Sequence, residues 1–219
     1  MRLHLRTSKS KELVPFNYQP FLTGALHKWI GKNNLHDDRL SLYSFSWLNG
    51  GNALKQGLRF EHGAHFFISV HDQHLLRNII QGVRENPEIA FGLVVNEIII
   101  QEDPIFEYEH KFMAASPIFI KRKIDGKENH FEFHDKKSSV LLTETLQNKL
   151  RKAGLNDADV SVQFDLGYSR PRTKVIYYNK IGNKVNICPV IIKGTPEQIL
   201  FAWNVGVGNS TGIGFGSIQ

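Results

Sequence analysis

The most informative segment of the chain is its glycine-rich end, 206-GVGNSTGIGFG-216, followed by only three residues. Five glycines in eleven positions indicate a backbone that turns sharply or approaches another group closely. A P-loop is excluded because the run lacks the lysine that binds phosphate. A dinucleotide-binding fingerprint is excluded because Thr211 stands where its third glycine belongs and no helix can follow. Taken alone, the run could also be a terminal hairpin that binds no ligand.

A short helix is predicted immediately before the glycine run. Thr195-Pro196-Glu197-Gln198 is a capping box with proline at the first helical position, and Gly206 is placed to end the helix. Further upstream, the hydrophobic pattern predicts a strand over 112–123, a hairpin at Asp125-Gly126, a helix over 139–152, and strands over 160–166, 173–178 and 184–193.

The first half of the chain has a clearer periodicity. A half-buried strand over 2–7 precedes a helix whose apolar residues share one face, namely Leu22, Ala25, Leu26, Trp29 and Ile30. A second helix begins at its cap Asp72 and is stopped by Asn86-Pro87. Strands are predicted over 40–48, 65–70 and 93–100. The resulting order, βαββαβ, is that of a ferredoxin-like domain.

The predicted fold class is therefore α+β, with two tandem ferredoxin-like (RRM-like) βαββαβ domains and a C-terminal glycine-rich loop. The least periodic stretch, 102–110, suggests an N-terminal domain over 1–109 and a C-terminal domain over 110–219 that carries the loop 206–216. The two halves share no repeated sequence, so the tandem arrangement depends on element order and on the resemblance described below.

The amino-acid composition excludes only a few classes of function. The chain has 27 basic and 21 acidic residues, and the net charge of +6 suits a phosphate-rich partner as well as it suits many ordinary soluble proteins. The single cysteine, Cys188, lies in an apolar run and is expected to be a small buried hydrophobe. No stretch is apolar enough for a signal peptide or a membrane span, so we expect a soluble cytoplasmic protein without a membrane partner.

The glycine run after a short helix resembles the C-terminal loop of the CRISPR repeat-processing endoribonucleases, the sixth CRISPR-associated family of the repeat-associated RAMP superfamily. Three further segments are similar to the same family: 14-VPFNYQ-19 with 21-FLTGAL-26, Asn86-Pro87-Glu88, and Ser116-Pro117-Ile118. They occur in the family's order. The resemblance implies a metal-independent endoribonuclease that cuts CRISPR precursor RNA within each repeat to give guide RNA, without a cofactor.

Such cleavage needs a base, an acid and a cation, because the 2′-hydroxyl beside the scissile phosphate must attack it and the 5′-oxygen must leave. The resemblance places the loop histidine of the family at His36 and the downstream cation at Arg39, with Lys32 as the alternative cation. His27 occupies the position where some members carry a tyrosine, which predicts a two-histidine site. The paired histidines elsewhere lack cysteine partners, so no metal site is expected.

Several residues are predicted to hold the RNA. They are the loop glycines Gly206, Gly208, Gly212, Gly214 and Gly216, and two basic clusters, Lys121, Arg122 and Lys123, and Arg170, Arg172 and Lys174. Both clusters could instead be solvated strand edges, where lysine guards against aggregation. The expected partner is CRISPR repeat RNA, with an effector complex as a further partner and a monomer or homodimer as the assembly. The alternative function is a non-catalytic protein or effector-complex subunit that holds repeat RNA without cutting it.

Overall fold

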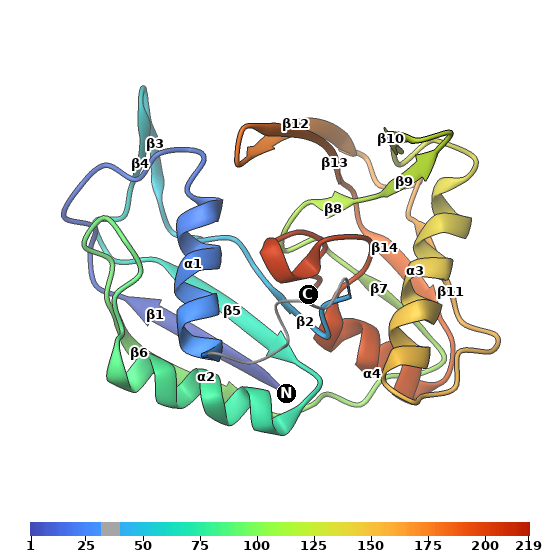
Figure 1. Ribbon diagram of the computed structural model, residues 1–219, viewed down its shortest axis with the longest axis horizontal. Coiled ribbons are helices and arrows are strands. Elements are labelled where there is room, and N and C mark those ends of the chain that lie inside the picture. The colour runs from blue at the N-terminus through green and yellow to red at the C-terminus, as the bar shows by residue number, and fades with distance from the viewer. Residues whose placement is uncertain (32–39) are drawn as a thin grey trace.

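The structure of the protein, a computed structural model, describes residues 1–31 and 40–219. Its two halves lie side by side, with α1 and α2 in front of the first sheet and α3 and α4 in the other half (Figure 1). The main elements of the first half are β1 (Arg2–Thr7), α1 (Gln19–Ile30), β2 (Tyr43–Phe45), β5 (His65–Val70), α2 (Gln73–Glu85) and β6 (Val95–Gln101). Their antiparallel sheet has the order β2-β5-β1-β6, as a ferredoxin-like domain requires.

Local chemistry explains where the two helices of this half begin and end. The Asp72 side chain accepts a hydrogen bond from the backbone N–H of His74 and so caps α2, while α1 ends at Gly31, whose φ is +80°. The two helices pack closely because Gly82 of α2 has no side chain. A Cβ at this position would lie 2.5 Å from the backbone Cα of Trp29.

The strand predicted over 40–48 is shorter than expected, because its regular pairing with β5 ends at Phe45 and only an isolated bridge from Asn49 to His65 follows. The Trp47 backbone N–H instead bonds the carbonyl of Ala115 in the other half of the molecule. A small hairpin, β3 (Asn52–Leu54) and β4 (Gly57–Arg59), follows in the stretch between the strands predicted over 40–48 and 65–70, where no strand was predicted.

The second half repeats the ferredoxin-like order. It contains β7 (Glu109–Phe112), α3 (Ser138–Lys152), β11 (Ser161–Phe164), β14 (Val190–Lys193) and α4 (Pro196–Val205). The sheet order is β11-β14-β7, and a bridge from Ala114 to Ile218 brings the chain end to the fourth position. The predicted α+β class with tandem ferredoxin-like domains is thereby confirmed.

The second half carries further strands in two small sheets. They are β8 (Ile118–Phe119), β9 (Lys121–Ile124), β10 (Lys127–His130), β12 (Arg172–Tyr178) and β13 (Ile181–Ile187). The β12–β13 ribbon reaches over the junction between the halves (Figure 1). The predicted hairpin at Asp125-Gly126 joins β9 to β10, and both turn residues have positive φ. Two predicted long strands were wrong, because 112–123 divides into separate short strands and 184–193 is split between β13 and β14. Pro189, which has no N–H to donate, lies at the second break.

Two clusters of buried apolar side chains form the cores, one drawn from residues 3–95 and the other from residues 106–218. The division at residue 109 itself stays a prediction. Arg2 joins the halves: its guanidinium carbon lies 3.7 Å from the ring centroids of both Phe67 and Trp203. The same group donates to the carbonyls of Trp203 (3.2 Å) and Ile218 (2.8 Å). Burial lowers the pKa of Arg2 to about 9.

Candidate functional site

The glycine-rich loop, which we define as residues 206–216, lies between the two domains and is mostly buried. Within its own half, Gly206 has a φ of +71°, and a Cβ there would lie 2.5 Å from the Gly216 carbonyl oxygen. A Cβ on Gly208 would lie 2.5 Å from the carbonyl oxygen of Phe119. Glycine is required at these positions because the backbone folds back on itself and on β8.

The other end of the loop packs against the first domain. A Cβ on Gly212 would collide with Ser41 Oγ, and one on Gly214 would lie 2.9 Å from the ring of Phe45. Two side chains of the first domain hold this part of the loop. Gln19 Nε2 donates to the carbonyl of Ile213 (2.7 Å), and Trp47 Nε1 donates to that of Gly214 (2.8 Å). The close approach predicted for the glycines is thus an approach to protein, and their contact with RNA stays a prediction.

The buried amine of Lys149 holds the glycine-rich loop in place through hydrogen bonds. Lys149 of α3 is 2% exposed, and its Nζ donates to Val205 O (3.0 Å), Gly206 O (3.2 Å) and Thr211 Oγ1 (3.0 Å). Burial lowers its pKa to about 7, whereas the carbonyls of Val205 and Gly206 at the carboxyl end of α4, together with the Thr211 hydroxyl, favour the ammonium form. The sequence analysis missed this residue. Its signal was a lysine on the apolar stripe of the predicted helix, three residues after Leu146.

His27, the histidine of α1 that was predicted as a site residue, lies on the side of the glycine-rich loop that faces the first domain. His27 is half-buried, and its Nε2 lies 3.5 Å from the hydroxyl of Tyr43, a residue of β2. The same hydroxyl lies 3.4 Å from the carbonyl oxygen of Gly212 in the η2 turn (Thr211–Ile213). Burial raises the pKa of Tyr43 to about 12 against the lowering effect of a hydrogen bond with Ser41. The hydroxyl therefore keeps its proton near neutral pH.

Tyr43 was not predicted as a site residue, because a tyrosine in a short apolar strand is most simply explained by packing. The remaining predicted catalytic residues, His36 and Arg39, and the alternative cation Lys32 lie outside the described residues.

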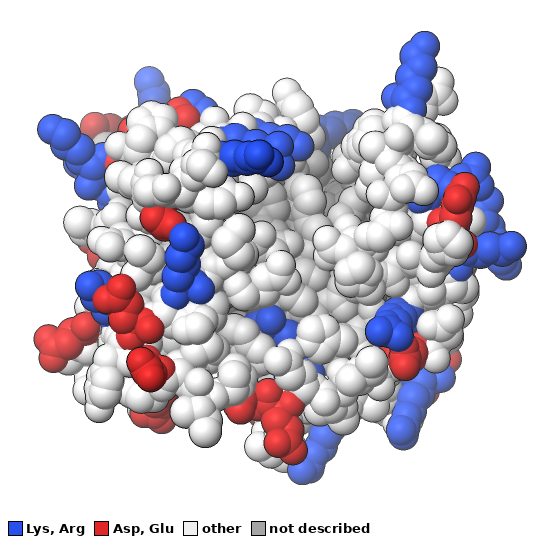
Figure 2. All heavy atoms as spheres, turned by 180° about the vertical axis from the view of Figure 1, so that it is seen from behind, with Lys and Arg blue, Asp and Glu red and all other residues white. Residues whose placement is uncertain are grey.

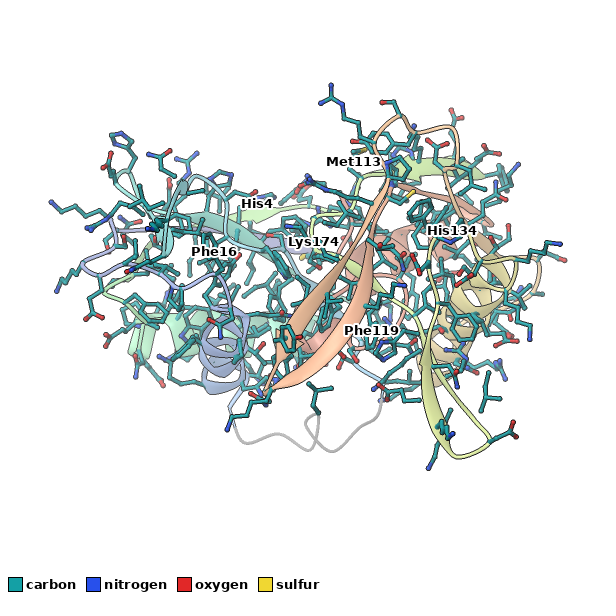
Figure 3. The ribbon with its side chains drawn as sticks, turned by 90° about the horizontal axis from the view of Figure 1, so that it is seen from above. His4, Phe16, Met113, Phe119, His134 and Lys174 are labelled. Carbon is teal, nitrogen blue, oxygen red and sulfur yellow. The ribbon has the colours of Figure 1, made fainter. Side chains whose placement is uncertain are left out.

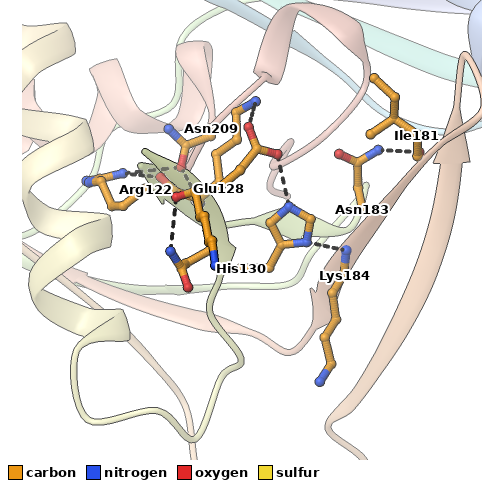
Figure 4. Close-up of polar contacts among 10 residues, drawn as sticks. Arg122, Glu128, His130, Ile181, Asn183, Lys184 and Asn209 are labelled. Carbon is orange, nitrogen blue, oxygen red and sulfur yellow. Dashed lines mark hydrogen bonds and ion pairs between the residues drawn. The ribbon is translucent and has the colours of Figure 1, made fainter. Parts of the chain in front are cut away.

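The first predicted RNA-binding cluster is largely engaged within the protein (Figure 4). The Arg122 guanidinium donates to Leu141 O (2.8 Å), Thr145 Oγ1 (2.9 Å) and Asn209 Oδ1 of the glycine-rich loop (3.3 Å). Asn209 Oδ1 also accepts from the Lys121 backbone N–H (2.8 Å), so this cluster positions the loop. Lys123 is exposed.

His130 lies beside this cluster on β10 and is half-buried. Its Nε2 lies 3.0 Å from Glu128 Oε1, and its Nδ1 accepts the backbone N–H of Lys184 at 3.2 Å (Figure 4). Hydrogen bonds from His130 and Lys121 lower the pKa of Glu128. Both ring nitrogens of His130 are occupied, which leaves neither for proton transfer to RNA.

The second predicted cluster is exposed. Arg170 and Arg172 line a shallow pocket with Tyr168 and Pro171, and Lys174 projects from β12. The β12–β13 ribbon crosses the junction of the two domains, as Figures 1 and 3 both show. Tyr178 near its tip is close enough to Tyr43 to influence the pKa of that residue. The tip of the ribbon therefore lies near Tyr43, while Arg172 stands at the opposite end of β12.

The opposite face of the molecule has a hollow between the domains, with most charged side chains placed around its periphery (Figure 2). A cavity of about 480 Å³ on this face is lined by His4, Arg6 and Phe67 of the first sheet and by Gln219 at the chain end. It is separate from the His27 region, which lies on the helical side of the same sheet.

Within residues 1–31 and 40–219, no three His, Cys, Asp or Glu side chains gather as metal ligands would. The helices in this part of the chain are all too short or too polar to cross a membrane. Cys188 is 1% exposed, as expected of a small buried hydrophobe.

The fold is that of proteins with two ferredoxin-like domains in tandem, and solved structures of this class match the whole chain. One described as an RAMP protein binding different RNA substrates has a TM-score of 0.88 and 18% identity, covering 100% of this chain and 98% of that one. A protein of a Cas6-related gene from Pyrococcus furiosus has a TM-score of 0.85 and 18% identity, with coverage of 100% and 97%. A Cas6 product complex, from Thermus thermophilus, has a TM-score of 0.69 and 14% identity, with coverage of 100% and 99%.

The family model for the C-terminal part of CRISPR-associated protein Cas6 matches residues 100–219, which is more than half of the chain. The chain therefore belongs to the Cas6 family. No curated protein sequence matches it. The resemblance to CRISPR repeat-processing proteins is confirmed, and binding and processing of CRISPR RNA follow as its general activity.

Proposed function

We propose that the protein is a metal-independent endoribonuclease that cuts CRISPR precursor RNA within each repeat. The observation that supports this most directly is the position of His27. The side chain lies at the junction of the domains, within reach of a tyrosine hydroxyl that also contacts the glycine-rich loop. Histidine is the side chain best suited to exchange a proton near neutral pH, and the β12–β13 ribbon that crosses the same junction carries the exposed side chains of Arg172 and Lys174.

In the proposed reaction, a base takes the proton of the 2′-hydroxyl, and the freed oxygen forms a bond to the adjacent phosphorus. The bond from phosphorus to the 5′-oxygen breaks, and an acid gives that oxygen a proton. The products are a 2′,3′-cyclic phosphate and a 5′-hydroxyl. His27 and His36 share the two proton transfers, and Arg39 stabilises the charge that develops on the phosphate.

The RNA is proposed to cross the junction between the domains near the β12–β13 ribbon. Arg170, Arg172 and Lys174 are exposed there, and Lys123 is exposed on β9. Lys121 and Arg122 serve this interface mainly by fixing Asn209 of the glycine-rich loop. Phosphate contacts of this kind position the strand without reading its sequence.

The direct test is cleavage of a cognate repeat RNA in excess EDTA. We expect cleavage to persist, and His27→Ala and His36→Ala each to slow single-turnover cleavage by at least roughly a hundredfold. The double variant should be scarcely slower than the slower single one, because groups that act as a unit are not additive. His134→Ala, which removes an exposed histidine elsewhere, is the matched control.

Two outcomes would contradict the proposal. Activity that disappears in EDTA and returns with magnesium or manganese would refute the metal-independent mechanism. Tight repeat binding without any cleavage by the wild-type protein would favour the alternative, a non-catalytic protein that only holds the repeat.

A further inference from the structure

On the basis of the function proposed above, we propose that a pocket where the β12–β13 ribbon begins holds one unpaired base of the repeat RNA, stacked on Tyr168. The pocket has a volume of about 430 Å³ and is lined by Tyr168, Arg170, Pro171, Arg172 and Ile187. A site for a single base needs an aromatic or apolar face for the ring and cations for the phosphates on either side. This pocket brings the two together.

The apolar part of the pocket comes from two neighbouring segments. Ile187 is paired directly with Arg172 across the β12–β13 ladder, so this part of the wall belongs to the ribbon itself. Tyr168 and Pro171 come from the loop that leads into β12. Both are half-buried, which leaves part of each ring accessible to a ligand. The wall therefore offers a base two ring faces and an aliphatic side chain.

The loop that carries Tyr168 is held in a hydrogen-bonded turn. The Tyr168 N–H donates to the carbonyl of Asp165 at 3.1 Å, and the Gly167 N–H donates to Asp165 Oδ1 at 3.0 Å. Asp165 Oδ2 forms an ion pair with Lys111 Nζ of β7 at 2.5 Å. These contacts fix the backbone beside the tyrosine before RNA binds, which lowers the cost of ordering the site.

Two arginines supply positive charge at the rim of the pocket. Arg170 and Arg172 are exposed, and within the described part of the chain neither side chain forms an ion pair or a hydrogen bond. Arg122, by contrast, is held by Leu141 and Thr145. A guanidinium binds phosphate through a planar fork of donors, so both arginines can contact the backbone of a bound strand. An acidic peptide would also satisfy the arginines, and removal of single bases from the RNA separates the two ligands.

The pocket lies away from the His27 region. Arg172 begins β12 and Tyr178 ends it, and the Tyr178 end comes near Tyr43. At about 3.3 Å per residue, the six steps along the strand separate its ends by roughly 20 Å. The base in the pocket is therefore not one of the two nucleotides that flank the scissile phosphate.

The coupling between base removal and a tyrosine variant tests the site without requiring cleavage. The probe is repeat RNA with a 2′-deoxynucleotide at the cleavage position, which prevents cutting, in versions that lack one base at each position in turn. Wild-type protein should lose affinity at one or two adjacent positions that do not flank the scissile phosphate. Tyr168→Leu keeps an apolar side chain but removes the aromatic face. It should bind the intact RNA at least about fivefold more weakly, and base removal at those positions should cost it nothing further.

Three further variants complete the test. Tyr168→Phe keeps the ring and should bind as wild type does. Tyr108→Leu is the matched control, because Tyr108 is 72% exposed and its carbonyl accepts the Gly194 N–H at the opposite end of β14 from Asp165. It should leave the affinity and the sensitive positions unchanged. Tyr168→Leu should keep the wild-type slope of log affinity against log salt, whereas Arg170→Ala should reduce that slope by about 0.7.

Each remaining result has a definite meaning. If base removal costs Tyr168→Leu as much as it costs the wild type, the base site is wrong, and the arginines serve another ligand such as an acidic peptide. Coupling at a nucleotide beside the scissile phosphate would overturn the placement of the base. Wild-type protein that shows the expected coupling but does not cleave unmodified repeat RNA would refute the proposed function and leave the base site standing. Cleavage without coupling would refute the base site alone.

Discussion

Lys149→Met tests how the glycine-rich loop is held in place. Methionine keeps the unbranched apolar stem of Lys149 in the second core but removes the amine that donates to Val205 O, Gly206 O and Thr211 Oγ1. Three buried acceptors then lose their donor, which lowers the free energy of unfolding. At the same time an amine no longer has to be buried, which raises it. The two effects can be separated because only the second depends on pH.

The magnitudes of the two effects follow from the contacts and the pKa. Three orphaned acceptors cost about 1 to 3 kcal/mol each, or about 3 to 9 kcal/mol together. Burial lowers the pKa of Lys149 from 10.5 to about 7. At about 1.4 kcal/mol per unit, burying the ammonium costs on the order of 5 kcal/mol below pH 7. These effects nearly cancel at pH 7, so the change in stability with pH is the better measure.

The sign of that change follows from proton binding. Between about pH 7 and pH 10.5 the unfolded chain holds a proton on Lys149 that the folded protein has released. The free energy of unfolding therefore rises with pH in this window, by about 2 kcal/mol from pH 7 to pH 9. Lys149→Met lacks the titrating group and should lose this rise. Urea unfolding followed by circular dichroism at pH 7, 8 and 9 measures both slopes.

The control is Lys152→Met, which removes an exposed lysine one turn further along the same helix. It should keep the wild-type slope. Burial also shifts the pKa of Arg2 to about 9 and that of Cys188 to about 11, but both groups titrate alike in the wild type and in Lys149→Met, so the difference between the two slopes isolates Lys149. A flat wild-type profile, or a variant at residue 149 that keeps the wild-type slope, would refute the buried-amine explanation.

Two further variants test the loop and the RNA surface. Gly216→Ala forces a Cβ onto a residue at φ +67° and into the Val207 carbonyl, so unfolding should become easier by about 2 to 5 kcal/mol in urea titrations. Gly126→Ala, at φ +79° with open space around it, should cost only about 1 to 2 kcal/mol, and equal losses would argue against the packing role. Arg172→Ala and Lys174→Ala together should weaken repeat binding and reduce the slope of log affinity against log salt by about 1.4, as two lost phosphate contacts would. An unchanged slope would remove this cluster from the interface.

Elements whose ends depend on neighbouring residues could be predicted from the sequence. The capping box at Thr195 and the cap Asp72 were placed correctly, because each acts on backbone groups within three residues. The limits of paired strands were harder to predict. Pro189 marks the break between β13 and β14, but the apolar residues on both sides of it predicted one continuous strand over 184–193. The β3–β4 hairpin is too short and too exposed to show a hydrophobic pattern.

The site was predicted less completely, because its contacts join distant parts of the chain. Tyr43 is 169 residues from Gly212, and Lys149 is 62 residues from Thr211. Nothing near Tyr43 in the sequence separates a functional role from packing, and the place of Lys149 on the apolar stripe of its helix indicates burial without identifying the acceptors of its amine. The same holds for Arg122, whose guanidinium turns inward to Thr145 and Asn209 although its neighbours suggested a basic surface.

The position of the glycine-rich loop makes the chemistry of His27 dependent on docking of the two domains. The histidine belongs to the first domain, and the carbonyl at the end of its hydrogen-bond chain belongs to the second. Arg2 and Gln19 hold the domains together through contacts to backbone carbonyls, which persist whatever side chains surround the site. A small shift between domains would stretch contacts of 3.4 and 3.5 Å beyond hydrogen-bond length while leaving both cores intact. If His27 transfers protons as proposed, domain docking sets the geometry of that transfer, and the buried glycines permit the close approach that docking requires.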